Sequence, residues 1–158
     1  MKGIVTINTD AAYHFKHKVG AFAYWIVSDY GRILMSGALK GKVSGPDEAE
    51  MQCIINAMHT VSNQKFPDVR LIVINTDALN SIHVFGKNKA AIAKYHLKKY
   101  GPLRDRFHKL SQKIGGTGLS IKFKHIPSHV HTDTPRNWVN DWCDKNAKIC
   151  LHQKIEGL

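Results

Sequence analysis

Two aspartates each follow directly on an apolar run, and they are the residues with the clearest potential for chemistry. The segments GIVTINTDA and VRLIVINTDA end in the same five residues and place Asp10 and Asp77 at the ends of two predicted strands. The residues after the two copies differ, which argues against a tandem duplication. Continuous apolar runs are typical of central strands, and ligands of open α/β sheets bind beyond the carboxyl ends of such strands. If the two strands are neighbours, we expect Asp10 and Asp77 to meet there.

Two further acids lie on predicted helices, on the stripes of residues that should face inward. Glu50 heads a stripe that continues through Ile54 to Val61 at helical spacing, and Asp144 shares a stripe with Ala147. Four carboxylates brought together would repel one another strongly unless divalent cations neutralised them. Ligand sets made only of oxygen select hard ions such as Mg²⁺, which favours carboxylates together with phosphate oxygens. Two Mg²⁺ ions, for which Mn²⁺ can substitute, are therefore the expected cofactors of an in-line phosphodiester displacement.

Each acid also has a simpler explanation, as a helix cap or a surface residue. Asp77 stands just before a predicted helix and could serve only as its N-cap. Glu48 crowds the same helical turn as Glu50, so that either glutamate could be the metal ligand. His125 and His131 raise the alternative of zinc, but no cysteine or acid completes a tetrahedral set with them. The shared placement of the four acids, at strand ends or on inward-facing stripes, favours an oxygen-ligated metal centre.

The composition fits one domain with a polyanionic partner. The 158 residues can build a sizeable core and show no linker-like shift in composition, so residues 1–158 are expected to form a single domain. With 23 Lys and Arg against 12 Asp and Glu, the formal net charge is +11, which favours nucleic acid as the partner. No leader-like segment or membrane-length apolar run is visible, which predicts a soluble, cytoplasmic protein with no membrane partner. The three cysteines are expected to be reduced.

The expected elements follow the order of an α/β fold. The first strand is followed by a hairpin that turns at 28–31, which gives three antiparallel strands. A helix over 43–61 crosses over to the strand that ends at Asp77, so that this strand can run parallel to another. Helical sequence runs from Ala78 to Phe85, breaks at Gly86 and continues in two segments divided at Gly101-Pro102. A half-exposed strand over 119–126 and a final helix capped by Thr134 complete the chain.

The two helical segments after Gly86 carry a run of basic residues. Such a run is either a solvated helix face or a surface that binds nucleic acid. Its members are Lys87, Lys89, Lys94, Lys98, Lys99, Arg104, Arg106, Lys109 and Lys113.

Taken together, these residues resemble ribonuclease H, type 1. The resemblance is carried, in order and spacing over nearly the whole chain, by Asp10, Ala49-Glu50, Thr76-Asp77, Ser128-His129 and the run from Asn140 to Asp144. It implies an α/β ribonuclease H fold whose five-stranded mixed sheet has antiparallel strands one to three, parallel strands four and five, and helices on both faces. It also implies Mg²⁺-dependent endonucleolytic cleavage of the RNA strand in RNA/DNA hybrids, which leaves 3′-hydroxyl and 5′-phosphate ends.

The resemblance also implies a role for each site residue. Asp10 would bridge both metal ions, Asp144 would help to hold the ion that activates water, and Glu50 and Asp77 would hold the ion beside the leaving 3′ oxygen. His129 matches the family's mobile loop histidine, to which proton transfer or product release is attributed. The lysine-rich segment resembles the basic handle with which some members grip the DNA strand.

Two segments depart from the family pattern. Many members carry paired asparagines before the helical glutamate and a glycine-rich or cysteine-containing turn after the first aspartate. Here these stretches read VSGPDEAE and DAAYHFKHKVG. The polar candidates for contacts to the nucleic acid are Ser44 in the first stretch and His14, Lys16, His17 and Lys18 in the second. Discrimination for RNA depends on contacts to 2′-hydroxyls, so the substrate preference stays open at this point.

Two other classes of function fit parts of the pattern. A DNA junction resolvase also places four acids on a basic surface of this fold, but resolvases act as dimers, and no dimerisation stripe is left over, so we expect a monomer. A non-catalytic module that binds hybrids could have kept the fold, although buried acids without a metal would only destabilise it.

Overall fold

A computed structural model describes residues 3–127 and 134–158 of the chain. The strands are β1 (Ile4–His14), β2 (Val19–Ser28), β3 (Gly31–Ala38), β4 (Leu71–Thr76) and β5 (Ser120–His125). The α-helices are α1 (Pro46–Gln64), α2 (Leu79–Gly86), α3 (Lys94–Gly115) and α4 (Pro135–Glu156), and the 3-10 turns η1 (Lys89–Ala91) and η2 (Gly116–Gly118) flank α3.

The strands form one five-stranded mixed sheet in the order β3-β2-β1-β4-β5. β1, β2 and β3 pair antiparallel, whereas β4 runs parallel to β1 and β5 runs parallel to β4. This arrangement confirms the predicted α/β class and sheet. The hairpin turn lies where it is predicted, and Gly31 adopts the positive φ of 115° that glycine tolerates best. The two strands with continuous apolar runs, β1 and β4, are neighbours in the middle of the sheet.

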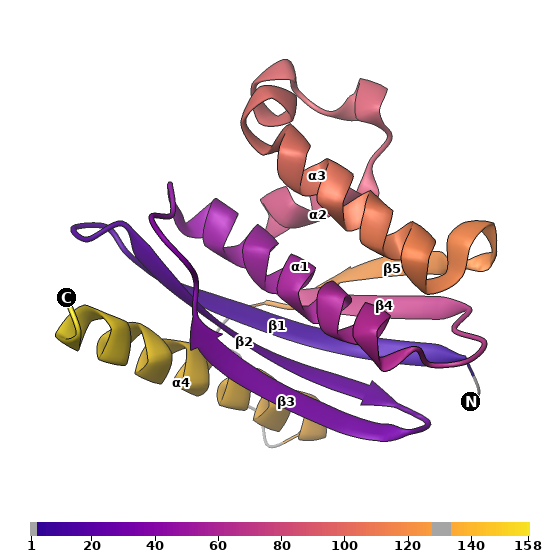
Figure 1. Cartoon of the computed structure of the whole chain (residues 1–158), viewed down its shortest axis with the longest axis horizontal. Helices are drawn as coiled ribbons and strands as arrows, with labels where there is room; N and C mark the ends of the chain where they lie inside the picture. Colours follow the sequence, from indigo (N-terminus) through magenta and orange to yellow (C-terminus); the bar gives the residue numbers. More distant parts are fainter. Residues whose placement is uncertain (1–2, 128–133) are drawn as a thin grey trace.

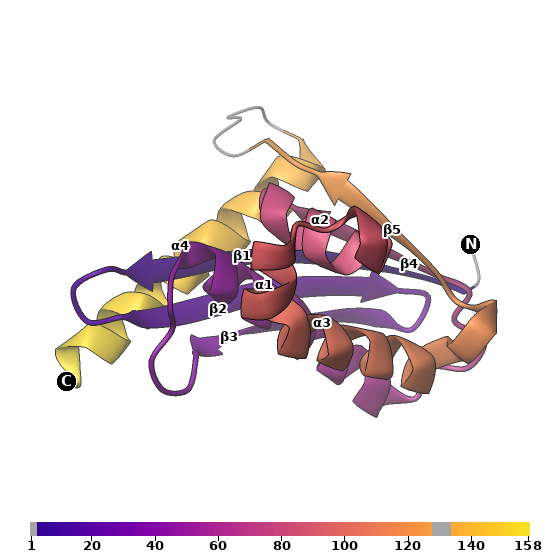
Figure 2. The same ribbon diagram turned by 90° about the horizontal axis from the view of Figure 1, so that it is seen from above.

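Helices cover both faces of the sheet (Figure 1). α4 packs on one face against β1, β2 and β3, and α1 packs on the other face against β1 and β2. Seen from above, α3 lies over α1, and α2 lies next to β5 (Figure 2). The main core fills the space between the sheet and α1, with Ile7, Ile54, Ile72 and Ile74 all fully buried.

Two helices confirm the predicted patterns of burial and capping. On α1, Ile54 and Val61 are buried as the stripe predicts. The Oγ of Thr134 accepts a hydrogen bond from the backbone N–H of Asn137 at 3.3 Å, so Thr134 caps α4 as predicted. On α4 the most deeply buried side chains are Cys143 and Ala147, which pack on the sheet.

One prediction about the helices is wrong, because α3 continues through Gly101-Pro102 as a single helix. A proline inside a helix removes one backbone hydrogen bond and normally bends or ends the helix. Here the side chains on both sides of the proline are anchored in the core: Tyr100 before it, and Phe107 and Leu110 after it, are buried. Tertiary packing therefore holds together a helix that local sequence alone would break.

The three cysteines are free thiols, of which Cys53 and Cys143 are buried. Among the described residues, no helix combines the length and the apolar character needed to span a bilayer.

Candidate active site

Three of the four predicted carboxylates converge where β1, β4 and α1 meet. One carboxylate oxygen from each of Asp10, Glu50 and Asp77 lies within 4.8 Å of the other two. The parallel register of β1 and β4 pairs Asn8 with Asn75, and each aspartate follows two residues later, Asp10 within β1 and Asp77 just beyond the end of β4. The sheet therefore delivers two carboxylates side by side, and α1 brings the third.

Glu50 approaches the cluster from the first turns of α1. Its Oε1 accepts a hydrogen bond from the backbone N–H of Ala11 at 3.1 Å, and the same N–H lies 3.0 Å from Oδ1 of Asp10. One amide thus holds two carboxylates close to each other. Glu48, the other candidate in this turn, uses its Oε2 to accept a hydrogen bond from the backbone N–H of Ser44 at 3.0 Å and lies outside the cluster.

The electrostatics of the cluster favour a cation. Burial, followed by the charges of Asp77 and Asp144, raises the pKa of Asp10 to about 7. Burial, followed by the charges of Asp10 and Asp77, also raises the pKa of Glu50 well above its ordinary value. The carboxylates cannot all be ionised near neutral pH unless positive charge joins them. An oxygen-only donor set with these raised pKa values fits a hard divalent ion.

Asp144 lies beside this group rather than within it. Its charge raises the pKa of Asp10, so the two carboxylates are near each other. Its Oδ2 accepts a hydrogen bond from Nζ of Lys148, one turn along α4, at 3.0 Å, and its side chain is 42% exposed. α4 thus places a fourth acid next to the three-carboxylate cluster, at a more exposed position.

Three further predictions concern the cap of α2, the histidines after β5 and the polar residues Ser44 and Lys16. Ala78, rather than Asp77, takes the N-cap position of α2. His129, its neighbour Ser128 and His131 lie outside the described residues. Ser44 and Lys16 are both exposed, on the loop before α1 and at the tip of the hairpin between β1 and β2.

The hairpin tip and the loop before α1 are joined by contacts that sequence reasoning missed. Nζ of Lys42 donates a hydrogen bond to the carbonyl oxygen of His17 at 2.9 Å, and the hydroxyl of Tyr13 donates one to the carbonyl oxygen of Val43 at 2.8 Å. Side chains that reach backbone carbonyls in another segment leave no pattern in the sequence. The two segments that depart from the family pattern therefore form one connected surface.

The basic residues after α2 lie on the surface. Lys87, Lys89, Lys94, Lys98 and Lys99 are all exposed, in the segment from the end of α2 to the first turns of α3. Nζ of Lys99 lies 5.9 Å and 5.4 Å from the ring centroids of Tyr95 and Tyr100. The lysines in this segment are thus available for contacts to phosphate groups.

Arg104, the remaining basic residue predicted to bind nucleic acid, has a structural contact. Its Nη1 donates hydrogen bonds to the backbone carbonyls of Val84 and Lys87, which lie at the end of α2. A carbonyl at a helix end has no partner within the helix, and a guanidinium that satisfies it stabilises the junction between two helices. Arg104 therefore fixes α3 to the end of α2.

Substituting Arg104 with Ala is expected to lower the free energy of unfolding by about 1–2 kcal/mol, because two carbonyls lose a charged donor. Urea unfolding followed by far-UV circular dichroism measures this loss. Lys98→Ala is the matched control, since Lys98 lies on the same helix, is exposed and has a similarly long cationic side chain. If both variants unfold at the same urea concentration, the contact has no structural importance.

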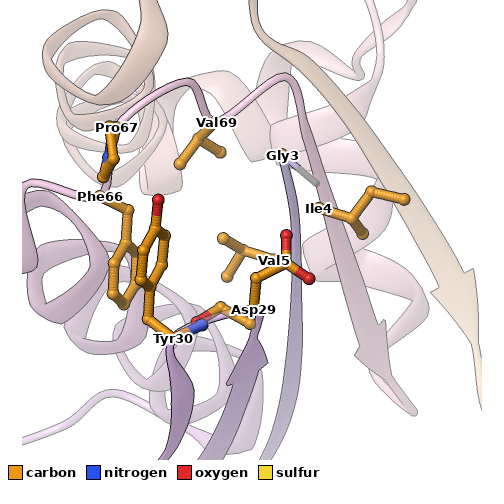
Figure 3. A pocket seen from close by; sticks show the side chains of 9 residues that line it. Gly3, Ile4, Val5, Asp29, Tyr30, Phe66, Pro67 and Val69 are labelled. Carbon is orange, nitrogen blue, oxygen red and sulfur yellow. The ribbon is translucent and has the colours of Figure 1, made fainter. Parts of the chain in front are cut away.

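A small pocket at the far end of the sheet does not belong to the site (Figure 3). It lies beside the stacked rings of Tyr30 and Phe66, whose centroids are 5.3 Å apart, and Gly3 and Val69 also line it. Its volume of about 10 Å³ has room for one water molecule at most. It is thus too small for an organic ligand.

Comparison with known proteins places the sequence in a family. Residues 8–110, more than half of the chain, match the reverse transcriptase-like family. No curated protein matches the sequence.

Several solved structures share the fold. Ribonuclease H1 from the halophilic archaeon Halobacterium salinarum is 20% identical, with a TM-score of 0.61 over 96% of this chain and 99% of that one. The N-terminal ribonuclease H domain of a Mycobacterium tuberculosis protein is 12% identical, with a TM-score of 0.70 over 99% of both chains. LC11 ribonuclease H1, which was isolated from compost, was solved in complex with an RNA/DNA hybrid. It is 14% identical, with a TM-score of 0.65 over 96% of this chain and 99% of that one.

At such identities the likeness to solved structures shows the fold, whereas the match over residues 8–110 shows the family. The chain therefore belongs to the reverse transcriptase-like family, and it resembles type 1 ribonuclease H in its motifs and its fold.

Proposed function

We propose that this protein is an endonuclease that hydrolyses the RNA strand of RNA/DNA hybrids with two Mg²⁺ ions and leaves 3′-hydroxyl and 5′-phosphate ends. The observation that carries the proposal is the cluster of Asp10, Glu50 and Asp77, whose carboxylate oxygens lie within 4.8 Å of one another. Support also comes from the net charge of +11 and from the family. The protein is proposed to act as a monomer built from a single domain.

The proposed metal ligands are the four acids. Asp10, Glu50 and Asp77 would hold the ions at the edge of the sheet, and Asp144 would complete the set from α4. When bound, a pair of divalent ions stabilises the charge on the attacking and the leaving oxygens, and Mn²⁺ can replace Mg²⁺ in this chemistry. Glu50 is preferred to Glu48 because the carboxylate of Glu48 is engaged by Ser44.

The other proposed residues bind the substrate or move a proton. His129 is proposed to assist proton transfer or product release. Contacts to phosphate groups of the hybrid are proposed for Ser44, Lys16, Lys87, Lys89, Lys94, Lys98, Lys99 and Arg104. Arg104 would use the N–H groups that do not bind the end of α2.

The contribution of the lysines is measurable as a dependence on salt. The double substitution Lys98→Ala with Lys99→Ala is expected to raise KM, leave kcat unchanged, and reduce the slope of log Kd against log salt by about 1–2, because each phosphate contact contributes about 0.9 to that slope. Binding is measured with a catalytically inactive background at several salt concentrations. Lys113→Ala, an exposed lysine at the other end of α3, is the control and should bind as the unsubstituted protein does. If the slope of log Kd against log salt does not change, Lys98 and Lys99 make no contact with phosphate groups and belong to an ordinary solvated helix face.

The test of the proposed function is cleavage of an end-labelled RNA strand in hybrid with DNA, in the presence of Mg²⁺. Single-stranded RNA, duplex RNA, duplex DNA and a four-way DNA junction are assayed beside it, with Asp77→Asn as the inactive control. Cutting of the hybrid alone, lost in the variant, is the expected result. Cutting of the junction or of duplex DNA would replace the proposal with a DNA nuclease, and cutting of nothing would replace it with a binding module.

A further inference from the structure

The asparagines of the two Asn-Thr-Asp motifs form a buried hydrogen bond beneath the carboxylates. Nδ2 of Asn75 donates to Oδ1 of Asn8 at 2.8 Å, and Nδ2 of Asn8 donates to the backbone carbonyl oxygen of Trp25 at 3.3 Å. Asn8 and Asn75 are only 6% and 5% exposed. This chain of two bonds links β4 to β1 and β1 to β2 through side chains, in addition to the ladders of backbone bonds.

The bond between the asparagines specifies the register of β1 against β4. Asn8 and Asn75 are direct partners in the parallel ladder, and their neighbours toward the start of the strands are mostly aliphatic. A slip by one residue would turn every side chain of a strand to the other face. A slip by two residues would leave every side chain on its own face of the sheet, but it would break the hydrogen bond between the two asparagines. Each buried amide would then lack its partner, and an unpaired buried polar group lowers stability. Only the observed register pairs the two amides with each other, and even there Oδ1 of Asn75 is buried without a hydrogen-bond partner.

The same register decides whether a metal site exists. A slip by two residues would move Asp77 along β1 by about 7 Å relative to Asp10, a displacement larger than the whole cluster. Before metal binds, the three carboxylates repel one another in the correct register, because their oxygens lie within 4.8 Å of one another. The hydrogen bond from Asn75 to Asn8 favours the correct register. It depends on neither pH nor metal, because neither amide titrates.

We infer that Asn8 and Asn75 are positioning residues, which hold Asp10 and Asp77 at the spacing that divalent metal requires before the metal arrives. The inference rests on the proposed function, since it concerns the metal centre of that same site. It explains why the two strands share Asn-Thr-Asp rather than the aspartate alone: the first residue of the motif sets the position of the third.

The test is the affinity of the folded protein for Mn²⁺, measured by isothermal titration calorimetry without substrate. The double substitution Asn8→Val with Asn75→Val replaces both partners of a buried hydrogen bond by apolar side chains suited to strands, a change that leaves stability nearly unaltered. The expected result is a Kd for Mn²⁺ about tenfold weaker, the lower end of what is lost when the support of a metal ligand is removed. The thermal midpoint without metal should stay close to that of the unsubstituted protein.

A residue that only stabilised the fold would change the thermal midpoint and leave the affinity of the folded protein for metal unchanged. Thr6→Val is the matched control, because Thr6 lies on the same face of β1 as Asn8 but two residues further from Asp10. This variant is expected to bind Mn²⁺ normally. If the double variant does not fold, the single variant Asn75→Thr removes the same donor with a smaller change and carries the same expectation of weaker binding. A variant that binds Mn²⁺ as tightly as the unsubstituted protein overturns the inference, whereas failure of the unsubstituted protein to bind Mn²⁺ overturns the proposed metal centre instead.

Discussion

Cleavage of an RNA/DNA hybrid is expected to be abolished, by at least about a thousandfold, when Asp10 is replaced by Asn, because the reaction then lacks the charge that holds the ions in place. Asp10 is the residue on which the cluster depends most. Its carboxylate shares the Ala11 amide with that of Glu50, and its pKa is raised by burial and then by the charges of Asp77 and Asp144. Asn has the same shape but no negative charge. Hybrid binding should change little, since the proposed phosphate contacts come from other elements.

A matched control separates this effect from any acid-to-amide change. Asp68→Asn makes the same substitution at an exposed position with a φ of 57°, a left-handed conformation that Asn accepts as readily as Asp. It should cleave at the rate of the unsubstituted protein. Single-turnover assays measure the rates, and electrophoretic shift assays measure hybrid binding. Wild-type cleavage by Asp10→Asn would show that the cluster is not the catalytic site.

The second large effect is a dependence of stability on pH that divalent metal removes. Asp10 has a pKa of about 7 in the folded protein against 3.8 as its ordinary value. The folded state therefore binds the proton more tightly than the unfolded state, and the metal-free protein loses stability as the pH rises from about 4 to about 7. Between pH 5.5 and 8 this loss amounts to about 2 kcal/mol, or about 5 °C in Tm. Bound metal holds the carboxylate in its ionised form and compensates for the loss, by about 2.7 kcal/mol at a metal concentration of 100 Kd.

Thermal melts at pH 5.5 and pH 8, with a chelator or with Mn²⁺, measure both parts of this prediction. Other groups also contribute to the dependence on pH, so the comparison is made with Asp10→Asn. In the variant without metal, the fall in Tm between the two pH values should be smaller by about 5 °C. An equal fall in both proteins would show that Asp10 does not carry the pH dependence, and an unshifted Tm with Mn²⁺ at pH 8 would favour a non-catalytic module.

Much of the fold follows from local sequence. β1 and β4 could be predicted as central strands because each is a continuous apolar run, and the predicted helix between them allows a crossover. Their adjacency was only a condition of the predicted site, and the structure meets it. The cap by Thr134 and the stripe of Ile54 and Val61 depend only on residues close together in sequence. The convergence of Asp10, Glu50 and Asp77 could be expected because strand ends and a helix stripe restrict where these side chains point.

What sequence reasoning missed depends on partners that are distant in the chain. The persistence of α3 through Pro102 results from burial of Tyr100 and Phe107 against other elements, which no helical propensity reveals. The contacts from Arg104 to the end of α2 convert a residue that sequence assigns to phosphate binding into a structural residue as well. The shared Asn of the two motifs was visible, but its meaning required the register of β1 against β4.

The order of the strands has a consequence for how the protein comes to be active. The four acids reside on segments spread along almost the whole chain, and β1 must wait for β4, beyond α1, before its parallel side can pair. Parallel pairing across a crossover closes a long loop and is slow compared with hairpin or helix formation. Asp144 joins only when α4, which follows all five strands in the sequence, docks on the sheet. A chain that has been synthesised only as far as β3 can form the hairpin of β1 and β2, but it carries an incomplete set of acids, so the proposed metal centre cannot assemble before the segment with Asp144 has been made.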